Sequence, residues 1–315
     1  MSIGRKARYL EIAAAYSLPV FFQPWWLDSV VEEWGAVFVE DEKGVQAVWV
    51  YAIEKKLGIT LVRNPQLTPY LGPFFFHPEN LSLAKRLLRE EKLFSELYEQ
   101  LPSWSFMDVM TVPSFENFLV FHHRGFSHSQ RLTYYVDLSQ EKRAILDNIH
   151  SKQRYAIRQA EKELQLVDAH PFTGQFYDFH RETFESKGRH YPYSKSLLEN
   201  IITTAGERNQ SYFKAVVTRN NEVAGIAFCV YDKQIMYLLL TATNKKARHN
   251  GAVALLIKEA FLYAKDAGIR FFDFEGSMDK GIEQFFRSFG GERKTYLHVR
   301  KNNSKIWKFR EWLRK

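Results

Sequence analysis

Two stretches decide the fold: residues 214–231, KAVVTRNNEVAGIAFCVY, and residues 36–53, AVFVEDEKGVQAVWVYAI. Each has apolar runs of β type on both sides of a short polar turn, at Asn220–Asn221 in the first and Glu42–Lys43–Gly44 in the second. Two such runs joined by a turn of this kind predict a β-hairpin. The sequence therefore predicts one hairpin in each half of the chain.

Both halves continue in the same order, with a third strand, a helix, a further strand and a final strand. In the first half these segments are Gly58–Arg63, 79–100, Ser105–Val112 and 131–136, and in the second half Ile235–Thr241, 251–267, Ile269–Glu275 and 293–299. The repeat is too long for a solenoid, whose units have about 20–50 residues. We therefore expect a tandem duplication of one α/β domain with a mixed sheet; the alternative is two unrelated α/β stretches that share generic alternation.

The predicted domains are residues 1–138 and 139–315. A helical connector is expected over 140–164, with Ser139 as its N-cap and a break at 148–151. The tail, Lys305–Arg314, has the spacing of a final amphipathic helix, which we expect to pack back on the first domain.

Composition bounds the class of protein. The 315 residues are 45% hydrophobic and 25% charged, which excludes a disordered chain, a collagen and a coiled coil. Lys and Arg outnumber Asp and Glu by 44 to 36, and this net charge of +8 suits a nucleotide, a nucleic acid or an anionic membrane surface. The single cysteine, Cys229, excludes an intrachain disulfide and indicates a reducing compartment. With no apolar run near the roughly 20 residues that cross a bilayer, we expect a cytoplasmic protein without stable membrane insertion.

Several common active-site motifs are missing from the sequence. It has no phosphate loop, no Gly-x-Gly-x-x-Gly fingerprint and no Gly-x-Ser-x-Gly nucleophile turn. His122, His123 and His128 lack accompanying cysteines or spaced carboxylates, so no metal site is predicted. Cys229 lies in the middle of a predicted strand, where a free cysteine usually behaves as a small buried apolar residue.

Two segments are candidates for binding phosphate. The loop NKKARHNGA carries Arg248 and then Gly251 at a predicted helix start, where free amides and the helix dipole attract anions. In the connector, Arg154, Arg158 and Lys162 recur every four residues and share one helical face, which can follow the phosphates of a donor nucleotide or of tRNA. The alternative for both segments is an ordinary solvated basic surface.

Five strings together suggest a family. Arg248–His249–Asn250–Gly251 resembles the pyrophosphate-binding turn of the GNAT acyltransferases, with Val253 where that motif has Gly or Ala. The other strings are QPWWLDSV (23–30), TPYLGPF (68–74), SKQRYAIRQAEK (151–162) and FDFEGSMDKGIEQFFRSFGG (272–291). In this order they resemble the Fem-type (FemAB- and FemX-like) peptidoglycan aminoacyltransferases, which consist of tandem GNAT-like domains.

The resemblance implies a transferase that moves an aminoacyl or acyl group to an amine, such as that of a cell-wall precursor peptide. It implies aminoacyl-tRNA or acyl-CoA as the donor and no tightly bound cofactor. The family's Phe-Lys-x-x-Phe-Gly pattern places a lysine where this chain has Phe286, and Arg287 is adjacent. Two alternatives stay open: an acyl-CoA-dependent N-acyltransferase on a small molecule, and a non-catalytic binding protein that keeps the fold, which Phe286 favours.

Direct acyl transfer needs a base for the amine and donors for the oxyanion. Asp273 and Glu275, at the end of a predicted strand, are the candidate bases, with Ser277 and Arg287 as candidates for the oxyanion. For Asp273 the alternative is a structural carboxylate that caps a turn. The residues predicted to bind donor or substrate are Tyr70, Arg154, Arg158, Lys187, Arg189, Tyr191, Tyr237, Arg248 and Gly251. The loop SKGRHYPYS, which contributes three of them, has an ordinary surface turn as its alternative. The sequence predicts neither the acceptor nor an oligomeric state.

Overall fold

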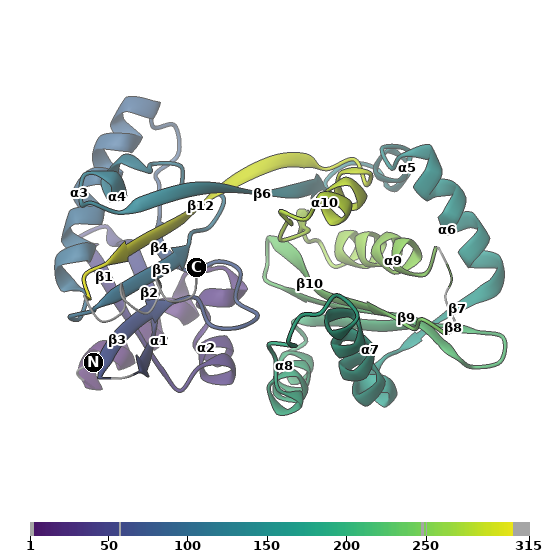
Figure 1. Ribbon diagram of the computed structural model, residues 1–315. Helices are drawn as coiled ribbons and strands as arrows, with labels where there is room; N and C mark the ends of the chain where they lie inside the picture. The colour runs from purple at the N-terminus through teal and green to yellow at the C-terminus, as the bar shows by residue number, and fades with distance from the viewer. Residues whose placement is uncertain (1–2, 57, 247–248, 250, 305–315) are drawn as a thin grey trace. The chain divides into compact units, whose positions relative to one another are not determined.

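The computed structural model describes residues 3–56, 58–246, 249 and 251–304 (Figure 1). Contacts divide the chain into two compact units: the first runs to Arg131 and resumes at Thr295, and the second is Leu132–Lys294. Arg248 and the predicted tail helix lie outside the described residues. None of the helices in the described ranges has both the length and the apolarity that a membrane crossing requires.

The first unit is a sheet with helices. Its strands are β1 (Glu33–Asp41), β2 (Gly44–Lys56), β3 (Ile59–Arg63), β4 (Gly72–Phe75), β5 (Phe106–Met110) and the C-terminal part of β12 (Glu292–Asn302). Its helices are α1 (Ile3–Ala15), η1 (Val20–Phe22), α2 (Pro24–Val30), α3 (Leu83–Gln100) and α4 (Leu119–His122). The strand order is β1-β2-β3-β5-β12, with β4 added on β2. The first three strands are antiparallel, β3 and β5 are parallel, and β5 and β12 are antiparallel.

Large aromatic rings fill the interior of the first unit. Trp49 on β2 is fully buried, and its ring lies 5.2 Å from that of Phe94 on α3 and 5.8 Å from that of Phe121 on α4. Phe94 and Phe121 meet edge to face at 4.7 Å. Ring pairs of this geometry stabilise a core beyond the area that they bury.

The second unit contains a sheet between two layers of helices. Its strands are the end of β6 (Ser127–Asp137), β7 (Leu164–Asp168), β8 (Ser211–Thr218), β9 (Val223–Tyr231), β10 (Ile235–Thr243) and β11 (Phe271–Asp273). Its helices are α5 (Lys142–Asp147), α6 (Ser151–Glu163), η2 (His170–Phe172), α7 (Thr173–Glu185), α8 (Lys195–Glu207), α9 (Ala252–Asp266) and α10 (Lys280–Arg287). The apolar helix α9 lies on one face of the sheet, whereas α7 and α8 lie on the other (Figure 1).

The two units repeat one strand order, as the duplication predicts. In the second unit β8, β9 and β10 are antiparallel, β10 and β11 are parallel, and β11 and β6 are antiparallel. This matches β1, β2, β3, β5 and β12 in the first unit, and in both units a helix (α3 or α9) leads into the parallel pair. Both predicted hairpins are present as β1–β2 and β8–β9.

The last strand of each sheet comes from the other half of the sequence. Tyr135–Asp137 of β6 pair with β11, and His298–Asn302 of β12 pair with β5. Each strand thus pairs in the other half and not in the half in which the repeat places it, and the unit bounds differ from a division at residue 138. Alternation identifies a strand but does not identify the neighbour with which it pairs.

The connector forms two helices, α5 and α6, separated at the predicted break. The residue at the N-cap of α5 is Glu141, so the assignment of Ser139 to that position was wrong. Instead, the side chain of Asp137 accepts a hydrogen bond from the Ser139 N–H at 2.9 Å, which makes Ser139 part of a turn at the end of β6.

Candidate active site

Strand β10 separates from its parallel neighbour after the first third of its length. It pairs with β11 only at Ile235–Tyr237 and then continues to Thr243 without it. On the opposite edge the register with β9 skips Leu239, which marks a β-bulge. The backbone of Leu238–Thr243 is therefore not paired with β11, and ligands of α/β sheets bind at openings of this kind at the carboxyl ends of strands.

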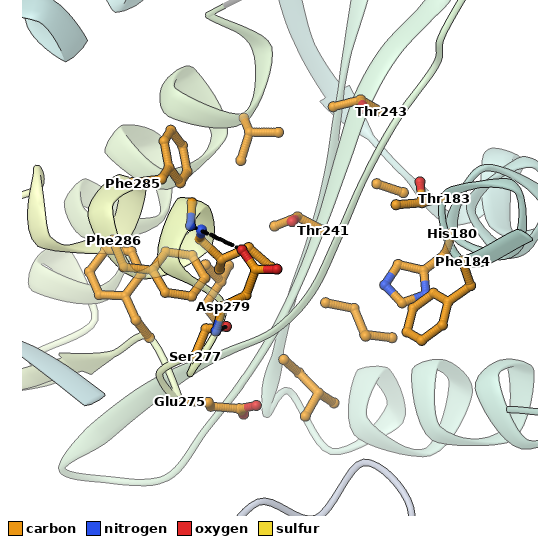
Figure 2. Close-up of a pocket in the computed structure, with 18 of the residues that line it drawn as sticks. His180, Thr183, Phe184, Thr241, Thr243, Glu275, Ser277, Asp279, Phe285 and Phe286 are labelled. Atoms are coloured by element: carbon orange, nitrogen blue, oxygen red, sulfur yellow. Dashed lines mark hydrogen bonds between the residues drawn. The ribbon is translucent and has the colours of Figure 1, made fainter. Parts of the chain in front are cut away.

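A cavity of about 1160 Å³ occupies this opening (Figure 2). The described residues of its walls come from the second unit: α7 and the loop after it, the edge of β10, His249 and Val253 around the start of α9, and the segment from Phe274 to Phe286. Its aromatic and apolar lining includes Phe184, Leu239, Phe274, Phe285 and Phe286. Its polar lining includes His180, Thr183, Lys187, Arg189, Tyr193, Thr241, Thr243, His249, Glu275, Ser277 and Asp279.

Glu275 sits at the end of β11 in a backbone conformation that few non-glycine residues adopt. Its φ is +56° and that of Gly276 is +72°, so two consecutive residues are left-handed. A side chain at Gly276 would place its Cβ 1.7 Å from the carbonyl oxygen of Leu132, so only glycine fits there. Strained backbone of this kind concentrates at functional sites, and here it turns a carboxyl group into the cavity.

The carboxyl group of Glu275 is held in an environment that disfavours its charge. The side chain is half-buried, and its Oε1 atom is inaccessible and has no hydrogen-bond partner among the described residues. Burial, followed by the charge of Asp273, raises the pKa of Glu275 well above its ordinary value. A carboxyl group shifted in this direction suits proton transfer near neutral pH.

Asp273 lies behind Glu275 and does not line the cavity. It is fully buried, and its Oδ1 accepts hydrogen bonds from the Thr133 hydroxyl and from the Glu275 N–H, the latter at 2.7 Å. This placement corresponds to the structural alternative for Asp273, because its carboxylate holds the turn that carries Glu275.

Ser277 and Arg287, the two oxyanion candidates, lie in different environments. Ser277 lines the cavity, and its Oγ accepts a hydrogen bond from the Asp279 N–H at 3.1 Å. Arg287 is not among the lining residues; its Nε lies 3.5 Å from Glu283, whose other partner is the Tyr134 hydroxyl. The structure therefore brings Ser277 to the site and directs Arg287 away from it.

The loop after α7 contributes two of its predicted residues directly. Lys187 and Arg189 are exposed and line the cavity. Asp279, on the facing segment, caps α10 by accepting from the N–H groups of Gly281 and Ile282. These backbone hydrogen bonds lower the pKa of Asp279, and the charges of Lys187 and Arg189 lower it further.

Two predicted tyrosines are buried outside the lining. The hydroxyl oxygen of Tyr191 lies 3.1 Å from His180 Nδ1. Tyr193, two residues later, lines the cavity, whereas Tyr191 does not. Tyr237 is 2% exposed and donates a hydrogen bond to Asp232 at 3.2 Å. Both rings belong to the frame that supports the walls.

The predicted phosphate residues in the described ranges do not line the cavity. Gly251 lies where α9 meets α6, and a Cβ there would be 2.3 Å from the Ala156 carbonyl oxygen. Close helix packing therefore accounts for this glycine. Arg154 donates to the Asp147 carbonyl at 2.7 Å, whereas Arg158 and Lys162 are exposed on α6.

Tyr70 belongs to the first unit. It is 1% exposed, with its ring 5.1 Å from that of Tyr296 and 6.2 Å from that of Phe21. The structure thus places Tyr70 in an aromatic core, and the residues that line the cavity come from the second unit.

Sequence reasoning missed His180, whose ring reaches the cavity from α7 (Figure 2). Burial lowers the pKa of this histidine to about 4. A histidine on the same helical face as Phe176 and Phe184 is a weak signal in a sequence, since spacing alone does not distinguish it from a core residue. Among the residues that the structure describes, no cluster of His, Cys, Asp and Glu is suited to hold a metal ion.

Comparison with known proteins agrees with this geometry. Residues 147–287 match the acetyltransferase (GNAT) domain family, and this range contains all the described residues that line the cavity. The chain resembles the crystal structure of FemX with a TM-score of 0.69 and 12% identity, over 98% of both chains. It also resembles a tandem GNAT protein from the clavulanic acid biosynthesis pathway (TM-score 0.54, 11% identity, 96% of this chain and 95% of that one).

A further likeness is to a conserved protein of unknown function from Bacteroides thetaiotaomicron (TM-score 0.54, 10% identity, 88% of both chains). No curated protein matches the sequence. At these identities the solved structures establish the fold, two tandem GNAT-like domains with a mixed sheet, as the sequence predicts.

Proposed function

We propose that this chain, whose residues 147–287 match the acetyltransferase (GNAT) domain family, is a Fem-like N-acyltransferase. It transfers an aminoacyl or acyl group to an amine by direct attack. The observation that carries this proposal is the Glu275 carboxyl group, which is turned into the cavity beside the open edge of β10.

In the proposed reaction Glu275 takes a proton from the acceptor amine as its nitrogen attacks the acyl carbon. The new C–N bond replaces the C–O bond of an ester donor or the C–S bond of a thioester. The leaving oxygen or sulfur regains one proton, and because Phe286 stands where the related enzymes carry a lysine, protonated Glu275 is the group in this wall that can return it. The Ser277 hydroxyl contributes a hydrogen bond to the oxyanion from the same wall.

For the donor we propose aminoacyl-tRNA, on the strength of the Fem resemblance, with a peptidoglycan precursor peptide as the acceptor and no tightly bound cofactor. The exposed cations Arg158 and Lys162 on α6, and Lys187 and Arg189 at the cavity, support a phosphate-bearing donor. Such a reaction would take place in the cytoplasm, where charged tRNA is found. The second candidate is an acyl-CoA donor, favoured by the match to an acetyltransferase domain.

A transfer assay separates these functions. Radiolabelled alanyl-tRNA and acetyl-CoA are each incubated with a set of amine acceptors, including a peptidoglycan precursor peptide, at two salt concentrations. We expect alanyl transfer with the wild type and a loss of about 10²–10⁴-fold with Glu275→Gln, the range for removal of a general base. Glu222→Gln, at an exposed carboxyl group in the β8–β9 turn, is the matched control and keeps full activity.

The two donors differ in their response to salt. Binding of tRNA falls steeply with salt because counterions are released, and Arg158→Ala with Lys162→Ala reduces that slope. Acetyl transfer without alanyl transfer identifies the acyl-CoA enzyme. Donor binding without turnover of either donor identifies a non-catalytic binding protein and contradicts the proposal.

A further inference from the structure

Aromatic rings pack around His180 at the cavity wall. Its ring lies 5.4 Å from that of Tyr191 with an interplanar angle of 68°, and 6.3 Å from that of Tyr193 at 27°. Phe184, one turn later on α7, packs against the imidazole from a third side at 5.4 Å. Figure 2 shows the His180 ring at the wall of the cavity, beside Phe184.

The hydrogen bond to Tyr191 fixes which ring nitrogen carries the proton. Nδ1 of His180 lies 3.1 Å from the Tyr191 hydroxyl, and among the described residues this hydroxyl has no other hydrogen-bond partner. If Nδ1 were the donor, the buried hydroxyl hydrogen would lack an acceptor, which is costly. Tyr191 therefore donates to Nδ1, and the neutral imidazole carries its hydrogen on Nε2.

The ring stays neutral across the physiological range. Burial lowers the pKa of His180 to about 4, and it raises the pKa of Tyr191 above its usual value, which keeps the tyrosine hydroxyl protonated as a donor. In the described part of the chain Nε2 has no hydrogen-bond partner. The cavity wall thus contains a neutral N–H donor that cannot act as a base, because its second nitrogen is occupied by Tyr191.

The N–H group of His180 and the carboxyl group of Glu275 belong to residues that line the same cavity. Tyr193 stacks on His180, and its pKa is raised to about 12 by burial and then by the charge of Glu275. His180, Tyr193 and Glu275 all line the same cavity, with His180 and Glu275 on different walls (Figure 2). When an amine attacks an acyl carbon from the Glu275 side, the carbonyl oxygen can accept a second hydrogen bond from the His180 wall, in addition to the one from Ser277.

We propose that the Nε2–H group of His180 donates a hydrogen bond to the carbonyl oxygen of the donor's acyl group. This inference rests on the proposed function, because it assumes that an acyl group occupies the cavity. A neutral imidazole suits the role, since it stabilises the negative charge that develops on the oxygen and does not protonate the attacking amine. The group recognised is an acyl ester or thioester carbonyl.

Nuclear magnetic resonance of the full-length protein labelled with ¹⁵N-histidine tests the inference without turnover. His180→Gln identifies the His180 signals. We expect an Nε2–H tautomer, neutral at pH 6–8, in the wild type, and a mixture of tautomers in Tyr191→Phe. An Nδ1–H tautomer or a charged ring at pH 7 overturns the proposal.

Matched pairs of ligands then test the contact. Acetyl-CoA is compared with CoA, and 3′-alanylamino-3′-deoxyadenosine with 3′-amino-3′-deoxyadenosine, so that each pair differs in its acyl group. We expect the Nε2–H signal to move with the acylated member of at least one pair and to remain in place with its partner. Equal shifts with both members of each pair, or no shift with any ligand, overturn the proposal.

Kinetics in the transfer assay provide the second readout. His180→Phe keeps an aromatic ring but removes the donor, and we expect kcat to fall about 10–100-fold with little change in the acceptor KM. His180→Gln, which retains an N–H donor, restores part of kcat, whereas a purely structural role would predict the better rescue from phenylalanine. His170→Gln, at an exposed histidine paired with Asp168, serves as the control and keeps the wild-type rate.

The two proposals fail in different ways. If no donor is turned over but the acyl-dependent shift is present, the reaction is wrong and the His180 contact stands. If transfer occurs and His180→Phe is fully active, the contact is wrong and the reaction stands.

Discussion

The Oδ1 atom of Asp273 accepts a hydrogen bond from the backbone N–H of Glu275 at 2.7 Å. The two carboxylates that the sequence offered as alternative bases are therefore connected: the carboxylate of Asp273 binds the backbone of Glu275. Asp273 is buried and holds the turn, and Glu275 reaches the cavity. In the proposed reaction Asp273 is a positioning residue, which acts through the conformation and the pKa of Glu275.

Asp273→Asn separates these two effects, because an asparagine oxygen can still accept the Glu275 N–H. The negative charge of Asp273 helps to raise the pKa of Glu275, so its removal lowers that pKa. We expect the acidic limb of the pH–rate profile to move to lower pH while maximal kcat stays within a few-fold. A profile that moves to higher pH, or does not move, contradicts this coupling.

Glu275→Gln is expected to raise stability while it slows transfer. A carboxyl group with a raised folded-state pKa binds its proton in the folded protein at pH values where the unfolded chain has released it. The folded state therefore loses stability as pH rises above the ordinary glutamate value. The Tm of the variant should match that of the wild type near pH 4 and exceed it increasingly toward pH 8. A constant difference in Tm across this range would show that burial of the charge is not the cause.

Arg287→Ala tests the oxyanion role that the sequence suggested. Because this guanidinium faces Glu283 and is not part of the cavity lining, we expect kcat to remain within about threefold of wild type. Arg287 is itself exposed, and an ion pair at the protein surface is worth about 0–1 kcal/mol, so stability changes little. A hundredfold loss of kcat in a folded variant would restore Arg287 to the site.

Cys229→Ala is expected to be active. Cys229 is fully buried on β9, and burial raises the pKa of its thiol well above the ordinary value, so it is a poor nucleophile. Turnover within a few-fold of wild type and a modest loss of stability follow from direct transfer. A trapped thioester on Cys229 would contradict that mechanism.

Local patterns predicted the elements well but not their partners. The hairpin turn at Asn220–Asn221 could be predicted because turn chemistry is local. Asn221 has the left-handed φ of +59° that asparagine tolerates. The sequence could not predict that β6 pairs with β11 and β12 with β5, because pairing between distant strands leaves no local signal. The motif around Glu275 drew attention to a segment that lines the cavity, yet the side that each carboxylate faces depends on the turn at Gly276. His180 was missed because its partner Tyr191 lies 11 residues away on a loop whose course the sequence does not fix.

Gly251→Ala distinguishes the packing role of this glycine from a phosphate-binding one. A Cβ would lie 2.3 Å from the Ala156 carbonyl oxygen and 3.0 Å from the Ala160 side chain, so α6 and α9 would have to separate. Overpacking of this kind costs about 1–3 kcal/mol. We expect a lower Tm by thermal denaturation, measured without any ligand present. Gly4→Ala on α1 is the control, because a Cβ there meets no atom within 4 Å, and alanine at that position leaves Tm unchanged or slightly higher. If Gly251→Ala instead keeps its Tm and loses binding of acetyl-CoA or charged tRNA, close approach of a phosphate, and not of α6, is the reason for glycine at this helix start.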